Sequence, residues 1–166
     1  MSSTPSRITL STSLLQAILA HLTACLPEEG CGLLGGELDG QGQADIRAVI
    51  PVENSLHSPV RFRMDPAAQL QAFNRLDEQG LELLAIFHSH PNGPDSPSIT
   101  DLTEFAYPGV LTLIFSPLDL NAQPDNPACW QCKSYRIDGV LSGQPTAVEV
   151  ELRVLDEPSS PQPDGV

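Results

Sequence analysis

The feature that most constrains the fold is a mostly apolar run at residues 81–87, which leads directly into His88 and, two residues later, His90. A short apolar run of this kind is typical of a buried strand. Because side chains alternate between the faces of a strand, both histidines should point to the same side. A loop rich in Pro, Gly and Ser follows, and residues 98–101 have the pattern of a helix start. The chain should therefore place two histidines and a helix N-terminus at one end of a strand.

Two interpretations of this segment compete. Ser98 and Asp101 match a capping box, in which the hydroxyl accepts from the third helical amide and the acidic side chain reaches back. On that interpretation the histidines are ordinary polar residues at a strand end. Alternatively, His88, His90 and Asp101 are the three-ligand set that holds catalytic zinc and leaves a fourth position for water. Taken together the residues favour the metal site, and a helix cap can orient Asp101 toward the metal at the same time.

The composition predicts one globular domain, with 166 residues of which 40% are hydrophobic and 17% charged. A net charge of −13 with only 8 Lys plus Arg disfavours nucleic-acid and anionic membrane partners. No apolar run approaches the ~20 residues that span a bilayer, and residues 1–7 lack the apolar core of an export signal. We therefore expect a cytoplasmic protein with neither a nucleic-acid nor a membrane partner.

The four cysteines, Cys25, Cys31, Cys129 and Cys132, do not form a recognisable metal or redox framework. Residues 129–132 are formally C-x-x-C, but no second pair with the spacing of a structural zinc site accompanies them. Their segment has the pattern of a strand, whereas a redox motif belongs at a βα junction. Packing or an incidental disulfide is the favoured role, with the redox state left open.

Residues 7–155 predict a single α+β domain of hairpin-connected strands and about three helices. The first helix should begin at Ser11 or Ser13 and end near Cys25, the second should begin at Asp65 and stop at Gly80, and the third should cover residues 99–107. The expected strands are 31–38, 44–52, 60–64, 81–88, 110–116, 130–137 and 146–155. We expect the flanking segments 1–6 and 156–166 to be disordered.

The spacing His-x-His, seven residues, Ser, two residues, Asp also matches, without a gap, the JAMM motif of the MPN-domain metallopeptidases. The sequence therefore resembles the small prokaryotic members of this family, over about residues 7–155. Residues 51–54 (Pro-Val-Glu-Asn), residues 62–66 (Phe-Arg-Met-Asp-Pro) and the late Trp130-containing strands share the resemblance. It implies the MPN fold: a curved, mostly antiparallel mixed sheet flanked by helices, in a cytidine-deaminase-like arrangement.

Members of this family also carry an upstream glutamate near the end of the first helix, in a context like Pro-x-Glu followed by small apolar residues and glycine. The matching context here begins at Pro27 and runs through Gly36. The position of the closing Leu-Leu-x-Gly selects Glu29 as that glutamate, with the adjacent Glu28 as the competitor.

The resemblance implies one Zn²⁺ per chain, held by His88, His90 and Asp101 and carrying a water that the metal acidifies. Glu29 would pass the proton of that water to the leaving amine, and Ser98 would stabilise the oxyanion. The implied reaction is deubiquitinase-like hydrolysis of an amide or isopeptide bond at the Gly-Gly type C-terminal tail of a ubiquitin-like or sulfur-carrier protein. The substrate-binding residues, the particular carrier and homodimer formation are left open.

Three other functions compete with this one. A non-catalytic MPN scaffold is the main alternative, but such proteins lack the metal set that is present here. A zinc nucleobase deaminase would need His-x-Glu and Pro-Cys-x-x-Cys, whereas this chain has His-Ser-His and places Ala128 between Pro127 and Cys129. A thiol protein built on Cys129 and Cys132 would leave the histidines unexplained.

Overall fold

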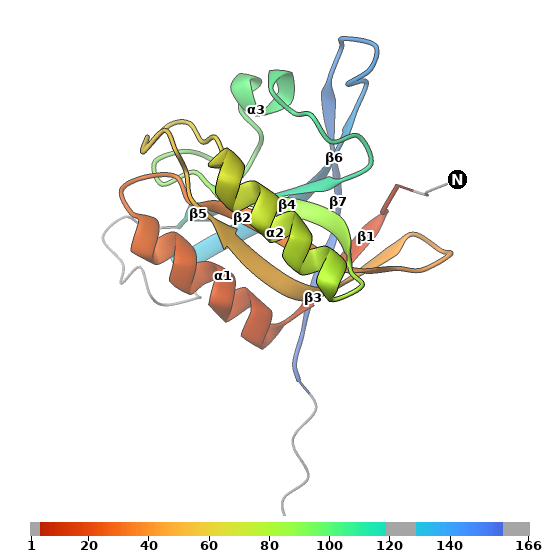
Figure 1. Ribbon diagram of the computed structural model, residues 1–166. Helices are drawn as coiled ribbons and strands as arrows, with labels where there is room; N and C mark the ends of the chain where they lie inside the picture. The colour runs from red at the N-terminus through yellow and green to blue at the C-terminus, as the bar shows by residue number, and fades with distance from the viewer. Residues whose placement is uncertain (1–3, 119–128, 158–166) are drawn as a thin grey trace, which may run out of the picture.

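The strands pair around a full circle, in the order β1-β3-β2-β4-β5-β6-β7 with β7 returning to β1 (Figure 1). The computed structural model describes residues 4–118 and 129–157. The strands are β1 (Arg7–Ser11), β2 (Cys31–Leu38), β3 (Gln43–Val52), β4 (Glu82–Ser89), β5 (Leu111–Pro117), β6 (Trp130–Asp138) and β7 (Thr146–Leu155). The helices are α1 (Thr12–Cys25), α2 (Pro66–Glu78) and α3 (Ile99–Thr103). The expected α+β class and three helices are confirmed.

Closure into a barrel corrects the expectation of a curved sheet that stays open. The strand responsible is β1, which the sequence analysis did not predict. It pairs in parallel with β3 on one side and with β7 on the other, so that Arg7 lies opposite both Gln43 and Glu151. The β4–β5 pair is also parallel and the remaining pairs are antiparallel, which confirms a mixed sheet. Pairing between residues so distant in sequence leaves no local pattern, and β1 has only five residues.

Helix boundaries follow the capping residues that the sequence displays. Ser11 caps α1 by accepting a hydrogen bond from Leu14 N, and Asp65 caps α2 with a proline in its first turn. Gly80 follows α2 with a φ of +67°, the left-handed conformation that a glycine after a helix adopts at low cost.

Two expected elements differ from the structure. Helix α3 ends at Thr103 rather than Tyr107, because the chain approaching Pro108 is biased away from helical angles and Tyr107 instead accepts a hydrogen bond from Gln69. The expected strand at 60–64 is reduced to a single bridge between Asn54 and Met64. That segment forms a wall of the functional site described below.

Strand β4 lies at the centre of the fold, between β2 and β5, and all but its first two residues are buried. Ala85 and Phe87 belong to the apolar cluster that α1 covers, whereas Ile86 belongs to the cluster that α2 covers. By alternation, His88 and His90 continue the face of Ile86. The two histidines therefore lie at the end of β4, on the side of the sheet that α2 covers.

No helix in residues 4–118 and 129–157 is long and apolar enough to cross a membrane. The first and last strands begin at Arg7 and end at Leu155. Of the segments expected to be disordered or looped, residues 1–3, 119–128 and 158–166 lie outside the described residues.

Gly32 offers a direct test of this packing, because β2 closely approaches both of its neighbouring strands there. A Cβ at Gly32 would lie 2.4 Å from the ring of Phe87 and 2.6 Å from the carbonyl oxygen of Ile50. We predict that Gly32→Ala lowers the free energy of unfolding by about 1–3 kcal/mol, the usual cost of overpacking a core, measured by urea titration. Gly40→Ala is the matched control, since nothing lies within 4 Å of its Cβ position. An equal effect of both substitutions would contradict the packing described.

Candidate metal centre

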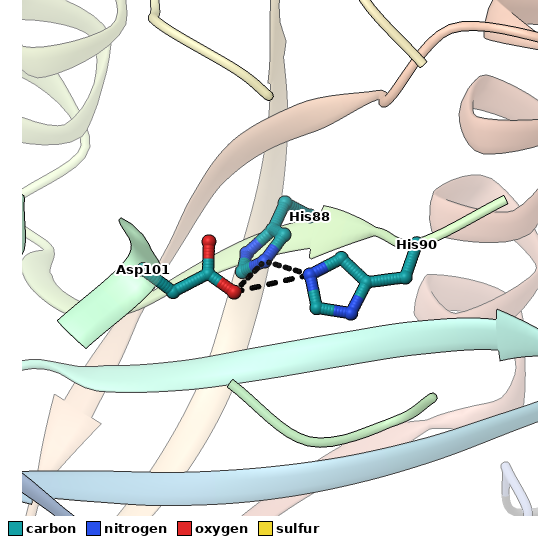
Figure 2. Close-up of side chains that lie close together, drawn as sticks. All are labelled: His88, His90 and Asp101. Atoms are coloured by element: carbon teal, nitrogen blue, oxygen red, sulfur yellow. Dashed lines mark hydrogen bonds and ion pairs between the residues drawn. The ribbon is translucent and has the colours of Figure 1, made fainter. Parts of the chain in front are cut away.

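Three side chains converge where β4 ends (Figure 2). The Nε2 atoms of His88 and His90 are 3.1 Å apart, and Oδ2 of Asp101 lies 3.3 Å from the first and 3.0 Å from the second. Ligand atoms at the ~2.0–2.1 Å bond lengths of tetrahedral zinc are separated from one another by about 3.3 Å. The three atoms therefore approximate one face of a zinc coordination tetrahedron, which leaves the fourth corner for another ligand.

The two histidines are oriented by different contacts. His90 donates from its main-chain N to the Phe115 carbonyl of β5 (2.8 Å), and its Nδ1 lies 2.7 Å from the carbonyl oxygen of Pro94. Because a carbonyl only accepts, Nδ1 of His90 carries the proton and Nε2 keeps its lone pair for a metal. His88 is instead held by stacking on Phe62, with ring centroids 4.5 Å apart and an interplanar angle of 26°. Its Nδ1 has no hydrogen-bond partner among the described residues.

Asp101 is held by the N-terminus of α3. The Ser98 hydroxyl accepts from Asp101 N (3.0 Å), and Oδ2 of Asp101 accepts from Ser98 N (2.8 Å), which confirms the capping box. The same Oδ2 atom faces both imidazoles. The capping box and the metal-ligand geometry therefore coexist, and the capping box orients the Asp101 carboxylate toward the two histidines.

The protonation states suit a cation. Burial on its own would raise the pKa of Asp101, but hydrogen bonds from His88 and His90, together with the Ser98 amide, hold that pKa well below its usual range. Burial lowers the pKa of His88. The pKa of His90 is raised despite burial, because its bonds to Asp101 and the Pro94 carbonyl favour the charged ring. The Asp101 carboxylate thus favours positive charge at the neighbouring imidazoles, a preference that also suits a divalent metal.

Glu29 lies just before β2, and its side chain faces the cluster while being almost fully buried, at 4% exposure. Burial raises its pKa to about 7, with the nearby positive charge of His90 opposing the shift and Asp101 adding to it. Its Oε2 has no hydrogen-bond partner among the described residues. Glu28, in contrast, is partly exposed and forms an ion pair with His57 (3.2 Å). Of the two glutamates, Glu29 is therefore the one that lies beside the cluster.

Ser98 and Glu29 line the same cavity as His90, with a volume of about 210 Å³. In the capping box the Ser98 oxygen uses a lone pair to accept from Asp101 N. A hydroxyl has one hydrogen to donate as well as two lone pairs. The helix cap thus leaves the Ser98 proton available for a group bound in the cavity.

A second cavity, of about 430 Å³, lies on the other side of the cluster and contains His88 and Asp101 in its wall. Its apolar lining comes from the loop before α2, from β4 and from the segment after α3: Val60, Phe62, Met64, Ile86, Phe105 and Tyr107. Polar side chains also line it, among them Arg61, Glu104 and Thr112. Val60 borders both cavities. The candidate ligands thus border two cavities, and the smaller one also contains Glu29 and Ser98.

Ser89, between the two histidines, faces away from them, as strand alternation predicts. It is fully buried, its hydroxyl accepts from Gly30 N (2.9 Å), and its own N donates to Gly30 O (3.0 Å). These two bonds fix the residue after Glu29 to the strand that carries the histidines. Ser89 therefore has a structural role at the site.

Several residues of the site were not singled out from the sequence. Phe62 stacks on His88, Val60 separates the cavities, and Asn54 holds the main chain of Glu29 through a 3.0 Å hydrogen bond to its carbonyl. Asn54 and Phe62 lie in the two segments noted for their family resemblance, 51–54 and 62–66, but that signal gave them no role. Their contacts depend on a loop whose path only the folded chain defines.

The remaining histidines and the cysteines lie outside the cluster. His21 packs edge-on against Phe87 and lies 3.0 Å from the Cys31 carbonyl, while His57 is an exposed partner of Glu28. All four cysteines are free thiols. Within the described part of the chain, His88, His90 and Asp101 are the one group of His, Cys, Asp and Glu side chains with metal-binding spacing, so the C-x-x-C residues contribute no second metal site there.

Residues 11–133 match the family model described as prokaryotic homologs of the JAB domain. The chain belongs to this family, which confirms the resemblance found in the JAMM spacing.

The relatives it matches are named as proteases and peptidases. A probable TtuB-protein conjugate cleaving protease of Thermus thermophilus is 42% identical over 92 residues, which cover 55% of this chain and 58% of that protein. A desampylase of Haloferax volcanii is 31% identical over 119 residues, covering 69% and 84%. A CysO-cysteine peptidase of Mycobacterium tuberculosis is 28% identical over 142 residues, covering 85% and 90%.

Solved structures agree with the fold. A protein of Desulfitobacterium hafniense, known from a solution structure, superposes with a TM-score of 0.75 at 34% identity, covering 92% of this chain and 95% of that one. A protein of Salinibacter ruber superposes with a TM-score of 0.59 at 26% identity. The architecture is thus shared along nearly the whole chain.

The ligand geometry makes a direct prediction about metal content. The protein, purified without chelator and dialysed, should retain about one zinc per chain, and His88→Ala or Asp101→Ala should abolish retention because two ligands hold zinc far more weakly than three. Elemental analysis measures the metal. His57→Ala is the control, since this histidine pairs with Glu28 and lies outside the cluster. Undiminished zinc in the first two variants would refute the ligand assignment.

Proposed function

We propose that the protein is a zinc-dependent peptidase or isopeptidase that cuts an amide bond at the C-terminal tail of a ubiquitin-like or sulfur-carrier protein. The observation that carries the proposal is the tetrahedral face formed by His88, His90 and Asp101 beside a buried glutamate of raised pKa. The names of the relatives support the substrate class, because they are a TtuB-protein conjugate cleaving protease, a desampylase and a CysO-cysteine peptidase.

His88 and His90 would hold the metal through Nε2, and Asp101 through Oδ2. Two imidazoles and one carboxylate are a donor set that zinc prefers, and an open fourth position is the mark of a catalytic rather than a structural site. Zinc, when bound, lowers the pKa of a coordinated water toward ~7 and polarises a carbonyl group.

Glu29 would be the general base and then the general acid. Since burial brings its pKa to about 7, its carboxylate accepts a proton from the attacking water and can return it to the leaving amine at neutral pH. An ordinary exposed glutamate would be too weak a base for this exchange. The Oε2 atom of Glu29 makes no hydrogen bond to another described residue.

Ser98 would donate its hydroxyl hydrogen to the substrate carbonyl oxygen as negative charge develops there. It lines the same cavity as Glu29 and His90. Because α3 and its capping box hold Ser98 in place, little reorganisation is needed when the charge appears.

The 430 Å³ cavity is where we place the carrier tail. It borders two of the proposed ligands and is largely apolar, so an extended tail can reach the metal through it. The barrel is closed, and each described strand has a neighbour on both sides. The segment before α2 forms only a single bridge, between Met64 and Asn54 in the loop that follows β3, and is therefore the nearby main chain with which a tail could pair. A scaffold without catalysis has no observation in its favour, since all five proposed site residues are present.

The experiment that tests the proposal uses candidate carriers ending in Gly-Gly, each joined by an amide bond to a reporter peptide. The protein should cleave after the second glycine, a chelator should stop cleavage, and zinc should restore it. Glu29→Gln should keep the zinc and lose activity by at least 10²-fold, because the proton acceptor is removed.

Glu28→Gln is the matched control for that experiment and should stay near wild-type activity. Cleavage that persists with chelator would exclude metal catalysis. An inactive Glu28→Gln beside an active Glu29→Gln would move the base by one residue.

Ser98 can be tested for chemistry apart from capping. Ser98→Ala should lower kcat by about 10²–10³-fold, the usual loss of one oxyanion donor, with zinc content unchanged. Ser98→Gly should be equally impaired, because glycine is tolerated at a helix N-cap at a cost of a few tenths of a kcal/mol yet has no hydroxyl. Restored activity in Ser98→Gly would assign the serine to capping alone.

A further inference from the structure

Asn54 occupies a central position in the loop between β3 and α2, although it is neither a proposed ligand nor a proposed acid–base group. Its side chain is 6% exposed. The Nδ2 group donates to the carbonyl oxygens of Glu29 and Arg61 (3.0 Å each), and Oδ1 accepts from the amides of Leu56 and Arg63 (3.1 Å each). A carboxamide has two donor hydrogens and two acceptor lone pairs. All four are in use.

These bonds join parts of the site that are far apart in sequence. Three of them close the loop 54–63 on itself, and that loop places Phe62 on the face of His88. The fourth leaves the loop and reaches Glu29, 25 positions earlier. The loop also holds Glu29 through a second hydrogen bond, in which Glu29 N donates to the Ser58 carbonyl (2.9 Å). Glu29 and the ring that supports His88 are thereby parts of one hydrogen-bonded unit.

The carboxyl group of Glu29 depends on these main-chain anchors for its position. Its Oε2 has no hydrogen-bond partner among the described residues, so side-chain bonding does little to fix it. The main chain is held on one side by Asn54 and Ser58, and on the other by the bonds between Gly30 and Ser89. Misplacing a reacting group by about 1 Å can cost 10²-fold in rate.

We propose that Asn54 is a positioning residue for hydrolysis: it sets the Glu29 carboxyl against the metal ligands by tying the main chain of Glu29 to the loop that carries Phe62. The proposal rests on the proposed function, in which Glu29 moves the proton. It assigns Asn54 no contact with substrate or metal.

The test is Asn54→Asp, which keeps the shape and an acceptor oxygen but turns the donor toward two carbonyls into a second acceptor. On the carrier–reporter fusion, kcat should fall by about 10–100-fold, while KM and zinc content stay close to wild type. Hydrogen exchange of the Glu29 amide should accelerate, because its bond to Ser58 depends on the loop. Asn54→Ser, which is too short to reach Glu29, should reproduce both effects if the new carboxylate prevents folding.

Ser55→Ala is the matched control. Ser55 lies in the same loop and its exposed hydroxyl donates to Arg63 O (3.0 Å), but it has no bond to Glu29. Its removal should leave kcat and Glu29 exchange unchanged.

Four outcomes would overturn the proposal. They are a folded Asn54 variant with normal kcat, an equal loss in Ser55→Ala, loss of zinc in the Asn54 variants, and unchanged exchange of the Glu29 amide. An inactive wild-type protein would instead refute the proposed function. The exchange measurement would then still report whether Asn54 holds Glu29.

Discussion

The structure of the site depends on the confinement of two imidazoles and a carboxylate within 3.3 Å of one another at the end of β4. His88 is almost fully buried and His90 nearly so. Bringing the lone pairs of these three ligand atoms together away from water is unfavourable unless a positive charge lies between them. The stacking of Phe62, the hydrogen bond to the Pro94 carbonyl and the capping box of α3 all hold ligand atoms in the cluster, and a cation is what makes that arrangement favourable.

The register of the sheet brings the proposed acid–base residue to this cluster. β2 pairs with β4 so that Cys31 lies opposite His88, and Glu29 lies two residues before Cys31. The β2–β4 pairing thus brings together Glu29 and His88, which are 59 positions apart in the sequence. The glycines of β2 permit this close pairing, because a side chain at Gly32 would meet both Phe87 and the β3 main chain. Packing deep in the barrel therefore determines how the site is assembled.

Sequence alone predicted what depends on neighbouring residues. The caps at Ser11 and Asp65, the capping box of Ser98 and Asp101, and the shared face of His88 and His90 are local patterns, and the structure has them. Barrel closure through β1 could not be predicted from the sequence, because it depends on parallel pairing with strands that are distant along the chain. Glu29 was found through family resemblance rather than spacing. The role of Asn54 was missed because its four bonds form only once the loop is folded.

Anomalous diffraction at the zinc absorption edge, from crystals of the wild-type protein, would show whether this cluster is a metal centre. We expect one strong peak per chain, about 2.0–2.2 Å from Nε2 of His88, Nε2 of His90 and Oδ2 of Asp101, with the fourth position facing the cavity that contains Glu29 and Ser98. A metal-loaded crystal with no peak at these three atoms, or with its peak at other residues, would refute the assignment of the metal centre.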